Sequence, residues 1–299
     1  MKIAFVGASG YGNVGDNTYP LVLRGAFPEH QLIFYNSDLP SHIPEDIAVM
    51  AIGGGGLIYN SGVTPRSTPS HHFQCMKHYM EWANQRRIPW GFLSCGVQLR
   101  REHETAVSEV LAPWIPWLNK AGFITLRSPG CVKVVEALTG RRDVNFFPDL
   151  AYLFRPKASE DTSAKEAATF VVGGKINPAD PFCQHLARLF RASELPICWL
   201  SMGAKCDDEK SIVTARRLFP ESCSVAESTP DKAFRQIARS RFVVSGRYHG
   251  MVFARCNRVP FFVPEETTWK IRNEDYSVSM HEAEGHLIAL RTIINSRLR

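Results

Sequence analysis

The distribution of apolar positions divides the first half of the chain into short segments of two kinds. Nearly continuous apolar runs occupy residues 3–7, 32–35, 48–52, 90–94 and 123–126. Such runs are typical of parallel strands whose two faces are both covered. Between them, apolar residues recur at helical spacing in residues 16–26, 71–85, 102–119 and 131–138. This alternation predicts an α/β domain built on a parallel sheet.

Proline and glycine predict where two of these helices break or end. Pro113 and Pro116 fall inside residues 102–119, and proline interrupts a helix because it lacks the amide hydrogen and clashes with the preceding turn. Gly140 follows residues 131–138 and suits the left-handed position after a helix. We therefore expect one broken helix and one helix with a glycine cap.

The second half of the chain repeats the alternation after a polar interval. Residues 155–168 are rich in Ala, Ser, Lys and Glu without apolar periodicity, which indicates a linker. Strands are expected at residues 169–172, 197–202, 224–226, 242–245 and 260–263, and helices at 181–192, 209–218, 230–238 and 286–299. We predict two Rossmann-like domains facing a cleft, residues 1–157 and 168–299, with the C-terminal helix able to pack back on the first domain.

Composition and charge narrow the range of partners. The chain has 299 residues, of which 44% are hydrophobic, enough for two buried cores. The formal charge is +6 and the pI is near 8.9. Lys and Arg occur in pairs rather than long runs, which argues against a nucleic-acid-binding arm. The excess charge favours small anionic substrates, an acidic polymer or a membrane surface.

The N-terminal segment does not resemble a signal peptide, and the cysteines are not spaced as in a metal or redox motif. Both observations predict a cytoplasmic protein with reduced thiols. The apolar run after Lys2 is too short for the core of a signal peptide and reads as a first strand. None of the eight cysteines forms a Cys-x-x-Cys pair, which argues against a zinc knuckle or a thioredoxin-type site. His71, His72 and His78 are compatible with a metal site, but a solvated helix start explains them as well. We expect no metal.

The most informative segment runs from Ser245 to Ala254. It joins the strand of residues 242–245 to an apolar helix start, and ligands of open α/β sheets bind at such junctions. Arg247 supplies a fixed cation that can fork onto a carboxylate or phosphate. His249 can transfer a proton near neutral pH. The pattern indicates an acid catalyst beside an anion clamp; the alternative is a turn with a surface Arg and a capping His.

A first glycine-rich segment follows the first expected strand. Residues 10–15 formally match the G-x-G-x-x-G dinucleotide fingerprint, with Asp38 as the ribose acid. In that fingerprint the first glycine forms the turn that leaves the strand, whereas here this turn comes earlier, at Gly7. An acidic group at Asp16, where we expect the helix to begin, would also oppose a pyrophosphate. A loop capped by Asp16 is the simpler interpretation.

A second glycine-rich segment, residues 53–56, leaves the third expected strand directly. Four consecutive glycines cost conformational entropy, so they indicate a backbone that passes close to a ligand or to another loop. The alternative is tight packing against the first glycine-rich segment.

Five segments in a fixed order resemble the polysaccharide pyruvyltransferase family over nearly the whole chain. They are Asn13-Val14-Gly15-Asp16, Gly53–Gly56, Leu126-Arg127-Ser128, Pro148-Asp149-Leu150-Ala151 and Ser245–Gly250. The resemblance implies a two-domain fold similar to GT-B glycosyltransferases. It also implies a transferase that moves the enolpyruvyl unit of phosphoenolpyruvate onto two sugar hydroxyls, giving a pyruvate ketal and phosphate.

The resemblance implies a set of site residues. His249, Arg247 and Arg127 would be catalytic. Residues implied in substrate binding are Asn13, Gly15, Asp16, Gly54, Gly55, Asp149, Ser245, Tyr248, Gly250 and Lys270. Two features depart from the family pattern: Ser128-Pro129 stands where Arg-Asp is usual after the fifth strand, and the chain is short. For Arg127, a structural ion pair is the alternative.

The chemistry expected of these residues involves phosphoenolpyruvate as donor and no cofactor. Two Arg forks suit its carboxylate and phosphate, and a protonated His can deliver a proton to its methylene carbon. The first domain would hold the acceptor, a glycan or lipid-linked oligosaccharide, and the second the phosphoenolpyruvate. Peripheral association with the inner membrane face and a homo-oligomer stay open. The alternatives are a GT-B glycosyltransferase that uses a nucleotide sugar and a non-catalytic sugar- or anion-binding protein.

Overall fold

The computed structural model describes residues 1–60, 68–99, 104–156, 166–173, 176–203, 207–226, 228–264 and 277–298. These residues form two compact units. The first unit is drawn from residues 1–10, 19–153 and 269–299, and the second from residues 11–18 and 154–268. Within the part of the chain so described, no helix combines the length and the apolar character that crossing a bilayer requires.

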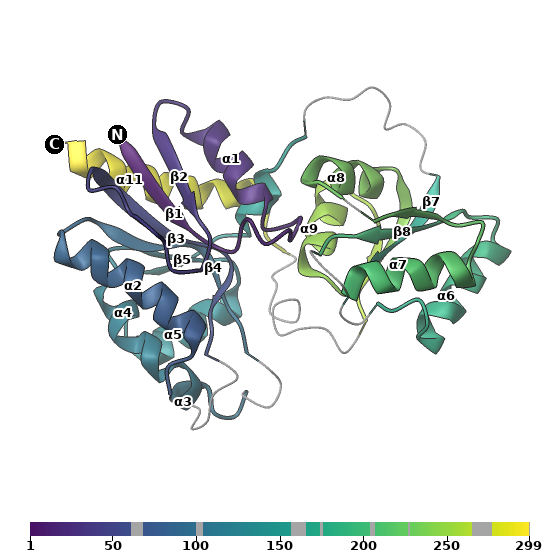
Figure 1. Ribbon diagram of the computed structural model, residues 1–299, viewed down its shortest axis with the longest axis horizontal. Coiled ribbons are helices and arrows are strands. Elements are labelled where there is room, and N and C mark those ends of the chain that lie inside the picture. Colours follow the sequence, from purple (N-terminus) through teal and green to yellow (C-terminus); the bar gives the residue numbers. More distant parts are fainter. Residues whose placement is uncertain are drawn as a thin grey trace. The chain divides into compact units, whose positions relative to one another are not determined.

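The first unit is built on a six-stranded sheet in which every neighbouring pair is parallel. Its strands are β1 (Lys2–Val6), β2 (Gln31–Tyr35), β3 (Ile47–Ile58), β4 (Trp90–Val97), β5 (Ile124–Leu126) and β6 (Val144–Phe146). The order across the sheet is β2-β1-β3-β4-β5-β6, and Figure 1 labels the strands from β1 to β5. The carboxyl ends of the strands therefore share one edge, and the glycines of residues 53–56 lie toward that end of β3.

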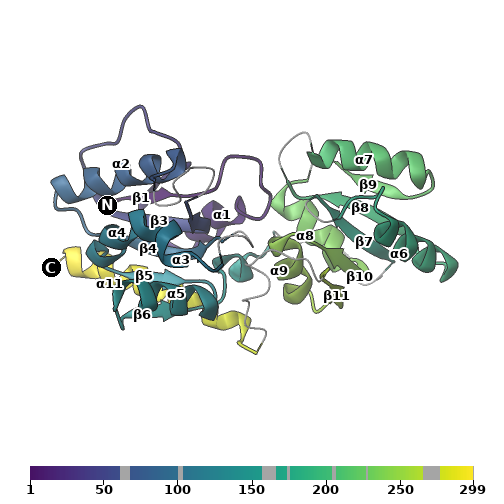
Figure 2. The same cartoon turned by 90° about the horizontal axis from the view of Figure 1, so that it is seen from below.

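Helices cover both faces of this sheet. Its helices are α1 (Thr18–Ala26), α2 (His71–Gln85), α3 (Val107–Leu111), α4 (Ile115–Lys120), α5 (Pro129–Thr139) and α11 (Glu284–Leu298), with 3₁₀ turns η2 (Ala112–Trp114), η3 (Leu150–Leu153) and η4 (Met280–Ala283). Helices α2, α4 and α5 pack into the cluster on one face. Helices α1 and α11 pack on the other face against Ile3, Phe5 and Val49 (Figure 2).

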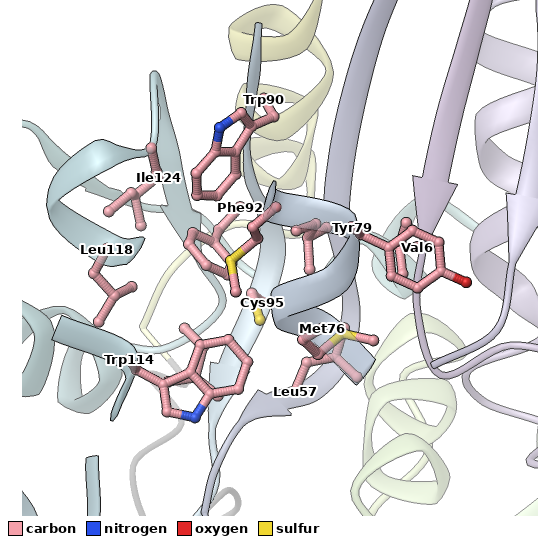
Figure 3. Packing of buried hydrophobic residues seen from close by; sticks show 14 of the residues in the cluster. Val6, Leu57, Met76, Tyr79, Trp90, Phe92, Cys95, Trp114, Leu118 and Ile124 are labelled. Carbon is pink, nitrogen blue, oxygen red and sulfur yellow. The ribbon is translucent and has the colours of Figure 1, made fainter. Parts of the chain in front are cut away.

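Aromatic side chains fill the larger of these two clusters. Trp114 is fully buried, its ring lies 6.2 Å from that of Phe92, and its indole N–H donates to the Tyr59 carbonyl at 2.9 Å. Figure 3 shows Trp90, Phe92 and Ile124 of the strands beside Trp114 and Leu118 of the helical layer. The expected break in residues 102–119 is confirmed, because Pro113 and Pro116 occupy the first turns of the two following helical segments. Such positions need no amide donor.

The second unit has a five-stranded parallel sheet in the order β11-β10-β7-β8-β9. Its strands are β7 (Ala167–Val172), β8 (Ile197–Ser201), β9 (Cys223–Val225), β10 (Ser240–Ser245) and β11 (Phe261–Phe262). Its helices are α6 (Pro181–Ala192), α7 (Asp207–Leu218), α8 (Pro230–Ala238) and α9 (Tyr248–Cys256). Helices α6 and α7 join the apolar cluster on one face. The predicted α/β class is confirmed.

Several boundaries differ from the sequence prediction. Residues 53–56 do not leave the strand as a loop but continue β3 to Ile58. They can do so because Gly53 lies against the β4 backbone, where a Cβ would come 1.6 Å from the Leu93 carbonyl oxygen. Helix α1 begins at Thr18 rather than Asp16, and β7 begins at Ala167, inside the expected linker. The short strand β6 had no apolar run to reveal it.

The division into units also differs from the expected boundaries at residues 157 and 168. Residues 11–18 follow β1 in the chain but cluster with the second unit, and α11 lies in the first unit although it ends the chain. Leu287, Leu290 and Ile294 of α11 are buried in the first unit's core. Each unit therefore takes a segment from the opposite end of the sequence.

Candidate functional site

The start of α9 is shaped by Ser245 and Gly250. The Ser245 hydroxyl accepts a hydrogen bond from the Arg247 amide at 3.2 Å and donates to the Arg247 carbonyl at 2.9 Å. This side-chain turn leads β10 into the helix with Arg247 at the N-cap position. A Cβ on Gly250 would lie 2.3 Å from the Ser245 hydroxyl oxygen. Glycine at this position therefore leaves room for the turn that orients Arg247.

One edge of the Arg247 guanidinium is fixed by the protein. Its Nε donates to the Val172 carbonyl at 3.0 Å, and its Nη2 donates to Asp208 Oδ1 at 2.5 Å. The other carboxylate oxygen of Asp208 accepts from the Ser201 hydroxyl at 2.9 Å and from the Gly203 amide at 2.8 Å. Asp208 is almost fully buried, while the Arg247 side chain is 30% exposed. The buried carboxylate is thus satisfied on both oxygens and holds the cation in one orientation.

Two glycines give the guanidinium its place. A Cβ on Gly173 or on Gly203 would lie 2.3 Å from Arg247 Nη2. Because Nε and Nη2 are engaged on one edge, the end-on edge keeps one N–H group of Nη1 and one of Nη2. Within the described residues, Nη1 has no hydrogen-bond partner. This end-on edge can grip a carboxylate or phosphate with two parallel hydrogen bonds.

His249 is the second residue of α9 and is covered by the segment of residues 13–16. Its Nδ1 lies 4.0 Å from Asp16 Oδ1, and both side chains are largely buried. A Cβ on Gly15 would lie 2.0 Å from the His249 ring, so only glycine allows this approach. Asn13 shapes the segment, because its side chain donates to Asp16 Oδ2 at 2.5 Å and accepts from the Gly15 amide at 3.1 Å. The Val14 amide ties the segment to the Met202 carbonyl at 2.9 Å.

Tyr248 precedes His249 and is itself buried. The two rings meet edge to face with their centroids 5.2 Å apart. This contact restricts the orientation of the imidazole from a second side.

In the first unit, Arg127 and Asp149 form a buried ion pair. Arg127 Nη1 lies 2.9 Å from Asp149 Oδ2, with the Arg side chain 3% exposed and the Asp side chain fully buried. The Tyr19 hydroxyl lies 2.8 and 2.7 Å from the two carboxylate oxygens of Asp149, and the Ala151 amide donates to Oδ1 at 2.8 Å. A buried charge needs such partners to offset the loss of its hydration. The arrangement matches the structural alternative that the sequence left open for Arg127.

The C-terminal helix supports this ion pair through His286. Its Nε2 lies 3.0 Å from the Pro148 carbonyl, which can only accept, so Nε2 carries the proton and Nδ1 accepts from the Thr125 hydroxyl at 2.8 Å. The imidazole is fully buried, and this burial lowers the pKa of His286 to about 4, although Asp149 acts in the opposite direction. His286 is therefore a neutral structural group beside Asp149.

The glycines of β3 line a small pocket at the carboxyl ends of β1 and β3. Gly54 and Gly55 have φ values of +73° and +113°, which strongly favour glycine. A Cβ on Gly54 would lie 2.9 Å from the Tyr19 ring. The pocket is mostly apolar and is lined by Phe5, Gly7, Ser9, Tyr19, Pro20, Leu23, Phe34, Gly53, Gly54, Leu93 and Leu150.

The structure thus brings the site residues predicted from the sequence into two groups. Asn13, Gly15, Asp16, Ser245, Arg247, Tyr248, His249 and Gly250 gather in the second unit, and Gly54, Gly55, Arg127 and Asp149 lie in the first. Lys270 falls outside the described residues. His72, a candidate metal ligand in the sequence, has its Nε2 2.8 Å from the Leu57 carbonyl and its ring stacked on Tyr59. Among the described residues, no group of three or more metal-ligating side chains occurs.

Sequence analysis missed the residues that hold Arg247. Asp208, Ser201, Gly173 and Gly203 were not recognised, although a signal existed for the glycines. Gly173 follows β7 directly and Gly203 lies two residues after the end of β8, close to the position at the carboxyl end of a strand that drew attention to residues 53–56. Asp208 lies near the start of a polar helix, where an acidic residue is unremarkable.

Solved structures share the fold at low sequence identity. A UDP-GlcNAc 2-epimerase from Methanocaldococcus jannaschii, in complex with UDP-GlcNAc and UDP, superposes with a TM-score of 0.55 at 9% identity, covering 99% of this chain and 93% of that chain. A putative UDP-N-acetylglucosamine 2-epimerase from Listeria monocytogenes gives 0.59 at 8% identity, covering 99% and 89%. Anabaena HepE, in complex with UDP and glucose, gives 0.55 at 11% identity, covering 93% and 84%. The two parallel sheets thus form a GT-B fold, as predicted.

The family is established from the sequence. A search of curated proteins found no match. The model of the polysaccharide pyruvyl transferase family, however, matches residues 22–263, which is most of the chain. This match includes Arg127, Asp149 and the whole of α9, and it confirms the resemblance found in the motifs. The chain is a transferase that belongs to the polysaccharide pyruvyl transferase family.

Proposed function

We propose that this protein transfers the enolpyruvyl unit of phosphoenolpyruvate to two hydroxyls of one sugar in a polysaccharide or lipid-linked oligosaccharide. The products are a cyclic pyruvate ketal and phosphate. The observation that carries the proposal is the pairing, at the start of α9, of an anchored guanidinium with an open edge and an imidazole that faces a carboxylate. Family membership supplies the reaction class.

Arg247 is proposed as the anion clamp of the donor site. Asp208 and the Val172 carbonyl occupy one edge of its guanidinium, so the ligand would meet the end-on edge. Phosphoenolpyruvate offers a carboxylate and a phosphate, and either anion matches this edge. Asp208 is a positioning residue in this scheme, because it would act on the donor only through Arg247. Lys270 is proposed as a second cation for the donor.

His249 is proposed as the acid of the addition step. A proton passes from the imidazolium to the methylene carbon of phosphoenolpyruvate, and the double-bond electrons form the new C–H bond. The resulting oxocarbenium-like centre is attacked by the first sugar hydroxyl, whose proton restores the imidazolium. Attack by the second hydroxyl completes the ketal as phosphate leaves, and the proton of that hydroxyl leaves with the phosphate. Asp16 faces Nδ1 and would stabilise the imidazolium, which leaves Nε2 to deliver the proton. The scheme calls for no cofactor.

The first unit is proposed to bind the acceptor. Its pocket lies at the carboxyl ends of β1 and β3 and is lined in part by the stacked rings of Phe5 and Phe34, whose centroids are 5.3 Å apart. Apolar and aromatic surfaces of this kind suit the C–H faces of a sugar. Arg127 and Asp149 lie buried in their ion pair, so the geometry supports a structural role for them beside this pocket. A lipid-linked acceptor would bring the basic protein to a membrane surface.

A nucleotide-sugar glycosyltransferase is the second candidate. It is favoured by the shared fold with proteins solved in complex with UDP. Melting curves with UDP and with phosphoenolpyruvate separate the two, because a ligand that binds only the folded protein raises its melting temperature. A shift with UDP alone would favour the glycosyltransferase.

The decisive experiment incubates the protein with phosphoenolpyruvate and a panel of lipid-linked oligosaccharides. Formation of a product with the mass of an added ketal, with matching phosphate release, is expected. His249→Gln should fold normally and lose turnover by roughly 10²-fold or more, as expected for loss of a general acid. Binding of both ligands without product would indicate the non-catalytic alternative, and near-wild-type turnover of His249→Gln would remove His249 from the acid step.

A further inference from the structure

Cys198 and Cys223 lie opposite each other on neighbouring strands of the second unit. Cys198 of β8 is paired in register with Cys223 of β9, so the two side chains project to the same face of the sheet. The two thiols are within hydrogen-bonding reach of each other. Directly opposed residues of a parallel pair have Cα atoms about 4.8 Å apart, inside the range that a disulfide spans.

The two thiols differ in their access to solvent. Cys198 is fully buried, whereas Cys223 is exposed on the edge strand. The hydrogen bond from Cys198 lowers the pKa of the Cys223 thiol to about 7. In contrast, burial raises the pKa of Cys95 to about 12 and that of Cys183 to about 11. Cys223 is therefore accessible and rich in thiolate, as a reactive cysteine must be, and the buried Cys198 lies directly opposite it on the neighbouring strand.

We propose that Cys198 and Cys223 form a redox-sensitive dithiol that low-molecular-weight disulfides oxidise to an intramolecular disulfide. The Cys223 thiolate attacks one sulfur of the small disulfide, a mixed disulfide forms, and one small thiol leaves. The Cys198 thiol then gives up its proton and attacks the Cys223 sulfur, and the second small thiol leaves. The two protein thiols are oxidised by two electrons, and the small disulfide is reduced to two thiols.

The position of the pair makes this disulfide reversible. A relaxed disulfide has its Cβ atoms about 3.8 Å apart, less than the spacing of about 4.8 Å between neighbouring strands, so closing the bond must tilt the two Cβ atoms toward each other. The short edge strand β9 can make such a movement, at the cost of strain. Strained and accessible disulfides have less negative reduction potentials and are the labile ones. The expected disulfide is therefore a regulatory rather than a permanent bond.

The pair also lies on the strand that leads to the Arg247 anchor. Cys198 is three residues before Ser201 on β8, and Ser201 and Gly203 hold the carboxylate of Asp208. A distortion of β8 on oxidation would pass along a continuous strand to this anchor. The dithiol itself, however, takes no part in the proposed transfer reaction, so the two can be tested separately.

The test uses glutathione disulfide with the full-length protein. After incubation and alkylation of the remaining thiols, peptide mapping should find Cys198 and Cys223 joined, and dithiothreitol should restore both thiols. In Cys198→Ala the resolving thiol is absent, so a stable glutathione adduct should accumulate at Cys223. Cys223→Ser should show neither product, and Cys256→Ser, a matched control at the end of α9, should form the disulfide as the wild type does.

Two results would overturn the proposal. One is a wild-type protein that keeps glutathione on Cys223 without joining it to Cys198. The other is a folded Cys198→Ala variant, checked by circular dichroism, that carries no adduct at Cys223. Cys198 is in the core, so a variant at this position can unfold. In that case the alkylation rates of the wild-type thiols test the proposal. If Cys223 reacts no faster than Cys256, the assignment of Cys223 as the reactive thiol is contradicted.

Discussion

At the scale of single residues, the position of the Arg247 guanidinium depends on neighbouring glycines that have no side chain. Gly203 carries no functional group, yet a Cβ there would lie 2.3 Å from Arg247 Nη2 and 2.7 Å from Asp208 Oδ2. We therefore expect Gly203→Ala to displace the guanidinium and to weaken phosphoenolpyruvate binding by about tenfold or more, equivalent to about 1.4 kcal/mol. Isothermal titration calorimetry measures the effect. Gly25→Ala is the control, because nothing lies within 4 Å of a Cβ at that helical position.

Asp208 provides a second test at this scale. Asp208→Asn keeps the size of the side chain but removes its charge, so the hydrogen bond to Arg247 loses its ionic partner. We expect a rise of about tenfold in KM for phosphoenolpyruvate with a smaller change in kcat, because the residue positions the clamp rather than the acid. Asp208→Glu should recover part of the affinity. Asp143→Asn is the matched control, since Asp143 pairs with Arg141 at the surface with its side chain 66% exposed. A fall in kcat at unchanged KM would contradict the positioning role.

The sequence revealed the candidate catalytic residues better than the residues that position them. Arg247 and His249 stand at a strand-to-helix junction with glycines on both sides, a pattern that a single chain segment displays. Asp208 became relevant only when β8 and α7 were folded together, because its partner is 39 positions away in the sequence. Arg127 shows the converse: the family resemblance implied a catalytic role for it, and only the tertiary structure shows its buried partner Asp149.

At the scale of elements, α11 joins the first unit through a buried histidine whose titration links stability to pH. Burial lowers the pKa of His286 to about 4 in the folded protein, whereas an unfolded chain has a value near 6.5. The unfolded state therefore binds the proton first as the pH falls. Stability from this group is complete above pH 6.5 and is lost progressively down to about pH 4.

We expect the titration of His286 to lower the free energy of unfolding by about 2 kcal/mol when the pH falls from 7 to 5. Urea unfolding of the wild type and of His286→Gln at both pH values measures it. The variant should be less stable at pH 7, because it loses the ring contacts with Thr125, Pro148 and Phe147. Its stability should fall less than that of the wild type on acidification. Equal losses in the two proteins would show that His286 is not buried in its neutral form.

Element positions followed from apolar patterns more reliably than element ends. Helix α2 has the expected bounds, and the broken helix and the Gly140 cap were found from proline and glycine chemistry. Strand β3 extended beyond its apolar run because its glycines allow close approach to β4, a contact that composition does not encode. The strand β6 has only three residues and escaped detection for lack of a pattern.

At the scale of the whole molecule, the two units exchange segments along the sequence. The segment of residues 11–18 belongs to the second unit and α11 to the first. Cutting the chain in the polar interval after residue 157 therefore gives two fragments, and neither fragment contains a complete unit. The fragment 168–299 lacks Asp16 and Gly15, which face His249. The fragment 1–157 lacks α11, and with it Leu290 and Ile294 of the core.

This exchange predicts how the fragment 1–157 behaves. Without α11 it should be unstable, because burial of a Leu or Ile side chain contributes about 1.5–3 kcal/mol and α11 buries two of them fully or almost fully. Joining residues 277–299 to it through a Gly/Ser linker should restore a cooperative thermal transition, which circular dichroism follows. Leu290→Asp in the joined protein should abolish that gain, whereas Ile288→Asp should not, since Ile288 on the same helix is 60% exposed. Fragment 1–157 alone could instead melt at the same temperature as the joined protein. In that case α11 would contribute nothing to the core of the first unit, and the structural role assigned to His286 beside Asp149 would be wrong as well.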